Sequence, residues 1–109
     1  MKLGMWIILV AIFLPSLVFS ATVEEVKAEI VRQSIQYNVS STVALRIAQC
    51  ESTFKDTAKN KNSTAKGVYQ FTDPTWKWIK AKGHQFDYKE NIRQFMLNYP
   101  KRPQWWVCK

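Results

Sequence analysis

The chain has 109 residues, which is enough for one small domain. Its 16 basic and 8 acidic residues give a formal net charge of +8, and such a surface suits a polyanion: nucleic acid, an acidic envelope polymer or an anionic membrane. A single histidine, His84, and two cysteines that we expect to pair with each other argue against a metal site.

The first 20 residues have the layout of a signal peptide. A short positive start is followed by an apolar run from Leu3 to Phe19, which Pro15 interrupts. Val18 and Ser20 suit positions −3 and −1, so we expect cleavage after Ser20 and an exported domain over residues 21–109. The alternative is an uncleaved anchor, for which the apolar run is at the short limit. Export also argues against intracellular nucleic acid as the partner.

The two cysteines bear on stability, because a domain this small has a marginal core. Cys50 and Cys108 permit one connectivity, and on an exported chain we expect a disulfide between them. A bridge that closes so long a loop stabilises by roughly 4 kcal/mol in the chain-entropy model. It would tie the end of a predicted helix to the C-terminal end of the chain.

The first two predicted helices have clear apolar periodicity. Thr22, with Glu25 three positions on, forms a capping box for a helix that runs to about Gln36. Ser40 is a good N-cap for the next helix, whose apolar residues recur every three or four positions. Glu51 therefore lies at the C-terminal end of an apolar stripe.

The rest of the chain contains shorter elements. Residues 55–66 are polar and aperiodic and predict a surface loop, and residues 67–71 predict a short strand or a buried turn. Two more helices are expected over 73–83, with Asp73 as N-cap, and over 87–100. The predicted fold is therefore small, single-domain and mainly α, with one disulfide and a minor β or irregular patch at 67–71.

Glu51 is the candidate general acid. The negative end of its helix dipole and burial against neighbouring aromatic side chains would both raise its pKa, as proton donation near neutral pH requires. The alternative is a solvated helix-end residue. A hydrolase with two carboxylates needs a second acid, and the candidates are Asp56, Asp73 and Asp87, of which the last two also fit helix caps.

Tryptophan and tyrosine are numerous for so short a chain. Such side chains stack on the apolar faces of sugar rings and line clefts, although in a small protein many also belong to the core. Trp105 and Trp106 are adjacent, so they cannot both face inward on an extended segment. We expect one of them to be exposed or to line a groove.

Three short motifs follow one another between Val39 and Ile92. They are a Glu-Ser pair at 51–52, an Ala-x-Gly turn at 65–67 and a Gly-x-x-Gln segment at 67–70. The stretch 87–92 is similar to an Asp-Pro-x-x-Asn-Ile helix start with tyrosine in place of proline. In this order and spacing they resemble the soluble lytic transglycosylase family of the lysozyme-like superfamily.

The resemblance implies a lysozyme-like helical domain that needs no cofactor or metal. It implies cleavage of the MurNAc–GlcNAc bond in peptidoglycan, with formation of 1,6-anhydro-MurNAc. Glu51 would be the acid/base, Ser52 its partner in the Glu-Ser pair, and Gln70 a substrate-binding amide. Tyr69 and Tyr99 are the further candidates for substrate binding.

The sequence departs from the family at one point, because the late Ala-Tyr-Asn motif is absent. Tyr99 and Tyr88 are the alternatives for the tyrosine of that motif. The expected partner is the glycan strand of peptidoglycan, bound by a monomer with no stable membrane insertion. The alternatives are a lysozyme-type glycoside hydrolase and a non-catalytic peptidoglycan- or chitin-binding module, while the capped helices and the disulfide disfavour a membrane-active protein.

Overall fold

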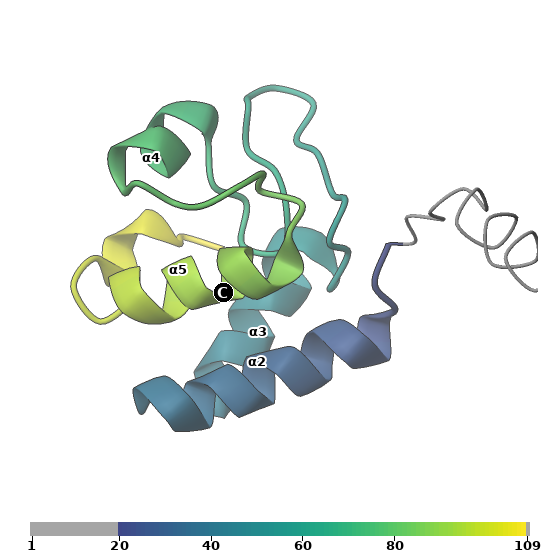
Figure 1. The fold of residues 1–109 in the computed structure, drawn as a ribbon, viewed down its shortest axis with the longest axis vertical. Coiled ribbons are helices and arrows are strands. Elements are labelled where there is room, and N and C mark those ends of the chain that lie inside the picture. The colour runs from purple at the N-terminus through teal and green to yellow at the C-terminus, as the bar shows by residue number, and fades with distance from the viewer. Residues whose placement is uncertain (1–19, 109) are drawn as a thin grey trace, which may run out of the picture.

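The computed structural model describes residues 20–108 (Figure 1). The predicted signal peptide, apart from Ser20, lies outside the described residues. Within residues 20–108, no helix is long and apolar enough to cross a membrane. The elements there are α2 (Val23–Tyr37), α3 (Ser41–Ser52), α4 (Asp73–Trp78), α5 (Tyr88–Asn98) and the 3-10 helix η1 (Pro103–Trp105).

The starts of α2 and α3 are as predicted. The Thr22 hydroxyl accepts from the backbone N–H of Glu25, and the Glu25 carboxylate accepts from the backbone N–H of Thr22, so the capping box is complete. Ser40 accepts from the N–H of Val43 at 3.3 Å and caps α3. Between the helices, Asn38 takes a left-handed conformation with φ +55° and forms the C-cap that ends α2.

The boundaries of α4 differ from the prediction. Its N-cap is Thr72, and Asp73 is already the first helical residue. The helix also ends well before Gly83, because the chain turns at Lys80, where φ is +57°. This turn brings the carbonyl of Gly83 back to the indole N–H of Trp76, at 2.8 Å, so a buried side chain rather than a helical turn holds the segment.

Asp87 caps α5 as predicted, and the side chain of Glu90, three positions on, forms its hydrogen bonds with other groups. Its carboxylate accepts from the backbone N–H of Lys82 at 2.9 Å and from the side chains of Arg93 and Gln94. Burial acts to raise the pKa of Glu90, but the hydrogen bonds from these three groups outweigh it and hold the pKa at about 2. The carboxylate thereby fastens the loop after α4 onto α5.

Helix α2 packs against both α3 and α5, and Figure 1 shows α5 running alongside it. An aromatic cluster in the core joins α5 to the 67–71 segment and to the C-terminal segment. Tyr69 stacks on Phe95 with 3.8 Å between ring centroids, and Trp106 meets Phe95 edge-on at 4.8 Å. The fully buried core residues of the helices are Val26, Ile30, Ala44, Ile47, Ala48, Ile92 and Phe95.

The segment 67–71 is a turn rather than a strand. Among residues 20–108 the β pairing consists of two isolated bridges, from Lys66 to Lys59 and from Lys66 to Phe71. The backbone N–H of Gln70 donates to the carbonyl of Gly67 at 3.2 Å, which closes the turn. The fold is therefore mainly α with an irregular patch at 67–71, as predicted.

The C-terminal segment is fixed by two features. Cys50 and Cys108 form the predicted disulfide, with 5.7 Å between their Cα atoms. Trp106 is buried, whereas Trp105 keeps 36% of its surface exposed, so one of the adjacent tryptophans faces inward and the other outward as expected. The disulfide and Trp106 together hold this segment beside the end of α3.

Candidate active site

Glu51 lies in the last turn of α3 and is partly buried. Ala44, Ile47 and Ala48, on the same stripe of the helix, have no exposed surface. Burial raises the pKa of the Glu51 carboxyl above its ordinary value, and no hydrogen bond or nearby charge contributes to the shift. The predicted direction of the pKa shift is confirmed. A carboxyl group in this state can hold a proton at a higher pH than a solvated glutamate.

Ser52 shapes the end of the helix. Its buried hydroxyl donates to the carbonyl of Ala48, one turn back, at 3.3 Å. The next two residues, Thr53 and Phe54, both take left-handed backbone conformations, with φ values of +51° and +64°. The chain therefore leaves α3 sharply after the Glu-Ser pair, and the hydroxyl proton of Ser52 is used within the helix. The predicted contact of Ser52 with substrate stays a prediction.

The other candidate carboxylates have partners of their own. Asp56 is buried and accepts from the backbone N–H of Ala21 at 2.9 Å. Asp73 forms an ion pair with Lys66 at 2.7 Å, which leads the lowering of its pKa. Asp87 caps α5. None of the three shares the environment of Glu51, in which burial alone raises the pKa.

The side chain of Gln70 is held in a fixed orientation. Its backbone φ is +56°, and its amide nitrogen donates to the carbonyls of Gly67 at 2.9 Å and Ala58 at 3.3 Å. Because both partners are carbonyl oxygens, the nitrogen of the amide must face them. The amide oxygen is then the atom of Gln70 that is available to accept a hydrogen bond from a ligand.

Gln70 lines a hollow of about 210 Å³ that is bounded by both polar and aromatic residues. Glu51 is not one of the residues that line this hollow. The residues around the hollow are Tyr69, Gln70, Phe71, Thr72, Thr75, Trp105 and Trp106.

The side chain of Tyr69 belongs to the core. It has no exposed surface, its ring stacks on Phe95, and its hydroxyl donates to the carbonyl of Ala44 in α3 at 2.8 Å. Burial raises the pKa of this phenol well above its ordinary value. A side chain with no exposed surface cannot contact a glycan in this conformation, so we do not retain the substrate-binding role predicted for Tyr69.

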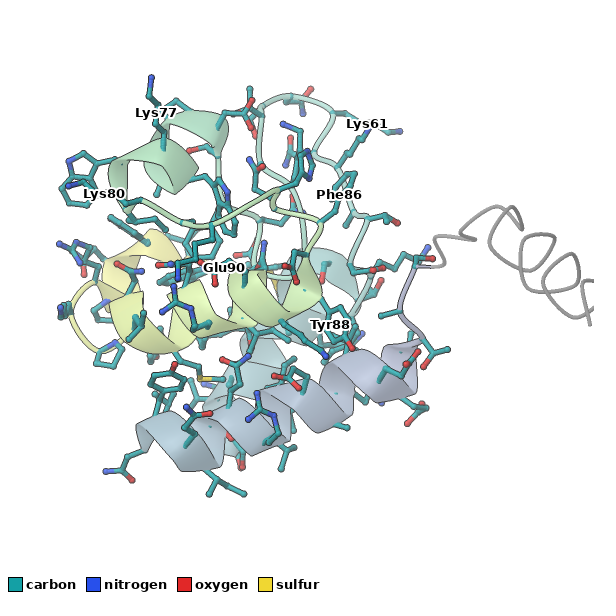
Figure 2. All side chains as sticks on the ribbon, viewed as in Figure 1. Lys61, Lys77, Lys80, Phe86, Tyr88 and Glu90 are labelled. Carbon is teal, nitrogen blue, oxygen red and sulfur yellow. A yellow bond between two sulfur atoms is a disulfide. The ribbon has the colours of Figure 1, made fainter. Side chains whose placement is uncertain are left out.

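Tyr99 and Tyr88, the alternatives for the missing tyrosine, lie at opposite ends of α5. Tyr99 is half-buried and stacks on Phe95, with 5.0 Å between ring centroids and 6.0 Å to the ring of Trp106. Tyr88 lies at the start of the helix, on the side that faces α2 (Figure 2). Tyr99 is thus the one that lies next to the C-terminal segment. The disulfide joins that segment to Cys50, the residue that precedes Glu51. The placement favours Tyr99.

The sequence analysis did not identify Asn91 as a residue of the site. This fully buried side chain accepts from the backbone N–H of Tyr69 at 2.9 Å and donates to the carbonyls of Gln85 at 2.9 Å and Lys66 at 3.4 Å. A Cβ atom on Gly67, whose φ is +86°, would lie 2.3 Å from the amide nitrogen of Asn91. Asn91 therefore supports the turn that presents Gln70. Its place in the 87–92 motif was the one signal in the sequence that could have identified it.

Comparison with protein families gave a match between residues 29–99 and the transglycosylase SLT domain. This span is more than half of the chain. The chain belongs to this family. Comparison with curated proteins gave no match, and neither did comparison with solved structures.

The SLT domain match confirms the family resemblance and shows which residues it covers. Glu51, Gln70 and Asn91 lie inside the matched span, and Tyr99 is its last residue. The segment that carries Trp106 and the second half-cystine lies beyond the span, although it packs onto the site. Residues beyond the matched span, Trp105 and Trp106, therefore help to line the hollow that contains Gln70.

Proposed function

We propose that this SLT domain is an exported lytic transglycosylase, which cleaves the MurNAc–GlcNAc bond of peptidoglycan and leaves a 1,6-anhydro-MurNAc end. The observation that carries the proposal is the state of Glu51, a half-buried carboxyl group whose pKa is raised by burial alone. The family supports the class of reaction. The basic composition suits an acidic wall polymer.

One carboxyl group is sufficient for this reaction. Protonated Glu51 donates its proton to the glycosidic oxygen as the bond between that oxygen and the anomeric carbon breaks. The carboxylate then accepts the proton of the C6 hydroxyl of the same MurNAc, whose oxygen bonds to the anomeric carbon and closes the ring. Glu51 is protonated again at the end. The reaction consumes no water and needs neither a second carboxylate nor a cofactor, in agreement with the other engagements of Asp56, Asp73 and Asp87.

Gln70 and Trp105 would bind the glycan. The amide oxygen of Gln70 would accept from a sugar hydroxyl or an acetamido N–H, since its nitrogen is already used. Trp105, partly exposed at the rim of the hollow, offers an apolar face for a sugar ring. Tyr99 would take the role of the missing motif tyrosine at the edge of the same aromatic cluster.

The test is the mass of the products. The exported protein is incubated with purified peptidoglycan, and the released fragments are measured by mass spectrometry. The proposal predicts fragments that end in 1,6-anhydro-MurNAc, each lighter by one water than a hydrolysed fragment. Reducing ends throughout would mean a glycoside hydrolase, and binding without release would mean a binding module.

Glu51→Gln and Glu24→Gln form a matched pair for this assay. Glu24 is an exposed glutamate on α2, so its replacement removes the same charge away from the site. Glu51→Gln should lower the rate by about 10²–10⁴, the usual contribution of a general acid, while glycan binding persists. Glu24→Gln should keep the wild-type rate. Equal activity of the two variants would remove Glu51 from the mechanism.

A further inference from the structure

Ala21 makes a contact that joins the start of the described chain to the segment that follows Glu51. Its backbone nitrogen donates to a carboxylate oxygen of Asp56 at 2.9 Å, across 35 positions of sequence. Asp56 is 6% exposed. Ala21 is also the residue that would become the N-terminus if the signal peptide were cleaved after Ser20. The buried carboxylate and the expected cleavage point therefore coincide in space.

The uncleaved chain gives Asp56 a weak partner. A peptide N–H is neutral and supplies one proton, whereas a buried carboxylate needs a compensating charge. Within residues 20–108, the ion pairs involve Glu29, Asp73 and Glu90, and no lysine or arginine pairs with Asp56. In the described part of the chain, Asp56 is thus a buried carboxyl group without a cationic partner.

Cleavage of the Ser20–Ala21 bond would supply that cation. Water adds across the peptide bond, so Ser20 leaves with a carboxylate and Ala21 keeps an ammonium group. The positive charge would arise on the nitrogen that already lies 2.9 Å from Asp56. Charge-assisted hydrogen bonds are shorter and about twice as strong as neutral ones.

The surroundings have room for the ammonium group. Ala21 and Asp56 lie in the wall of a hollow of about 570 Å³. Figure 2 shows Tyr88, another wall residue, between the start of α5 and α2. The titratable side chains that share the hollow with Asp56 are Glu25 and Tyr88. Glu25 is held by the backbone N–H of Thr22, which lowers its pKa and keeps it anionic. Its negative charge is partly offset by Lys89, whose nitrogen lies 6.0 Å from the centroid of the Tyr88 ring.

Asp56 lies on the segment that connects the two parts of the site. This segment leaves α3 after Glu51 and reaches Ala58, whose carbonyl accepts from the backbone N–H of Gly67 at 2.9 Å and from the amide of Gln70 at 3.3 Å. A bond at Asp56 therefore restrains the link between the proposed acid and the proposed substrate amide.

We propose that removal of residues 1–20 creates an ion pair between the new Ala21 ammonium group and Asp56, and that this pair fastens the segment between Glu51 and Gln70. The proposal rests on the export described under the proposed function. The tests of the ion pair use no glycan, so a negative result would not contradict the proposed transglycosylase activity.

The first experiment locates the N-terminus. The full chain is expressed in a bacterial host that exports it, and the mass of the intact protein is measured. The proposal predicts a chain that begins at Ala21. A chain that begins elsewhere, or that retains the leader, would overturn it.

The second experiment is a cycle of two changes. The mature chain is compared with the same chain acetylated on the Ala21 nitrogen, each with Asp56 or with Asp56→Asn. Acetylation keeps an N–H but removes the charge. In the protein with Asp56 it should raise the unfolding equilibrium constant about tenfold, because one pKa unit corresponds to a factor of ten. In Asp56→Asn it should raise the constant less than about twofold. Glu24→Gln, which removes a nearby exposed charge, should leave the tenfold effect in place. An equal effect of acetylation with Asp56 and with Asp56→Asn would overturn the ion pair.

The third measurement needs no variant, so it decides the matter even if Asp56→Asn does not fold. The Ala21 amine is titrated by NMR in the mature protein. A partner carboxylate should raise its pKa by about one unit or more above the ordinary range of 7.7–8.0 for an α-amino group. An amine that titrates within that range would overturn the proposal.

Discussion

Replacement of Asn91 by alanine tests how the turn at 67–71 is supported. The change removes an acceptor for the backbone N–H of Tyr69 and a donor for the carbonyl of Gln85, each at 2.9 Å, and a longer bond to Lys66 at 3.4 Å. A buried polar group left unpaired costs about 1–3 kcal/mol, so the two short bonds together predict a loss of about 2–6 kcal/mol. That is a large fraction of the 5–15 kcal/mol that holds a small domain together.

The assay is urea unfolding of the oxidised protein, followed by tryptophan fluorescence. Asn60→Ala is the matched control, because Asn60 makes its side-chain hydrogen bond within an exposed loop and its loss should cost less than about 1 kcal/mol. Asn91→Asp keeps the acceptor for Tyr69 but faces two carbonyls with a carboxylate, so it should also destabilise strongly. A loss below about 1 kcal/mol in Asn91→Ala would refute the support that we assign to this side chain.

Three further predictions use the same unfolding assay. Gly67→Ala should lower the free energy of unfolding by about 2–4 kcal/mol, because φ is positive there and the new Cβ atom would clash with Asn91 and the carbonyl of Gln85. Gly83→Ala, at φ +68° with open space around it, should lower it by only about 1–2 kcal/mol, which is the conformational strain. Equal losses in the two variants would contradict the clash at Gly67. Burial raises the folded pKa of Glu51, so the native state binds its proton more tightly and the free energy of unfolding should fall as pH rises from the ordinary glutamate pKa through the raised one; Glu51→Gln should remove this fall and be at least as stable as wild type at pH 7, and a markedly less stable variant would contradict the reasoning. Reduction of the Cys50–Cys108 bond should lower stability by roughly 4 kcal/mol, and a loss under about 1 kcal/mol would show that the bridge adds little.

Local signals predicted the helical part of the fold well. The capping box at Thr22 and the caps at Ser40 and Asp87 depend on residues three positions apart, so they are legible in the sequence. The sequence contains two cysteines and so allows one pairing, which the structure contains. Periodicity placed Glu51 at the end of a buried stripe, and its pKa shift follows from that position.

The failures concern contacts between distant segments. The sequence does not reveal that Trp76 bonds to Gly83 and thereby replaces the last turns of the expected helix. Nor does it reveal that the Tyr69 hydroxyl reaches Ala44, 25 positions away, which moves this side chain from the site into the core. Asn91 was visible only as part of a motif, because its partners are Lys66 and Tyr69 in one distant stretch of the chain and Gln85 in another.

The disulfide has a topological consequence. It closes a covalent ring across 58 positions, and Gln70, Asn91 and Tyr99 all lie within that ring, while α2 stands outside it and is held by packing. Residues 61–64 form an exposed stretch of the ring. A single proteolytic cut there would open the ring without separating its two halves, so the nicked protein would stay one molecule until it was reduced.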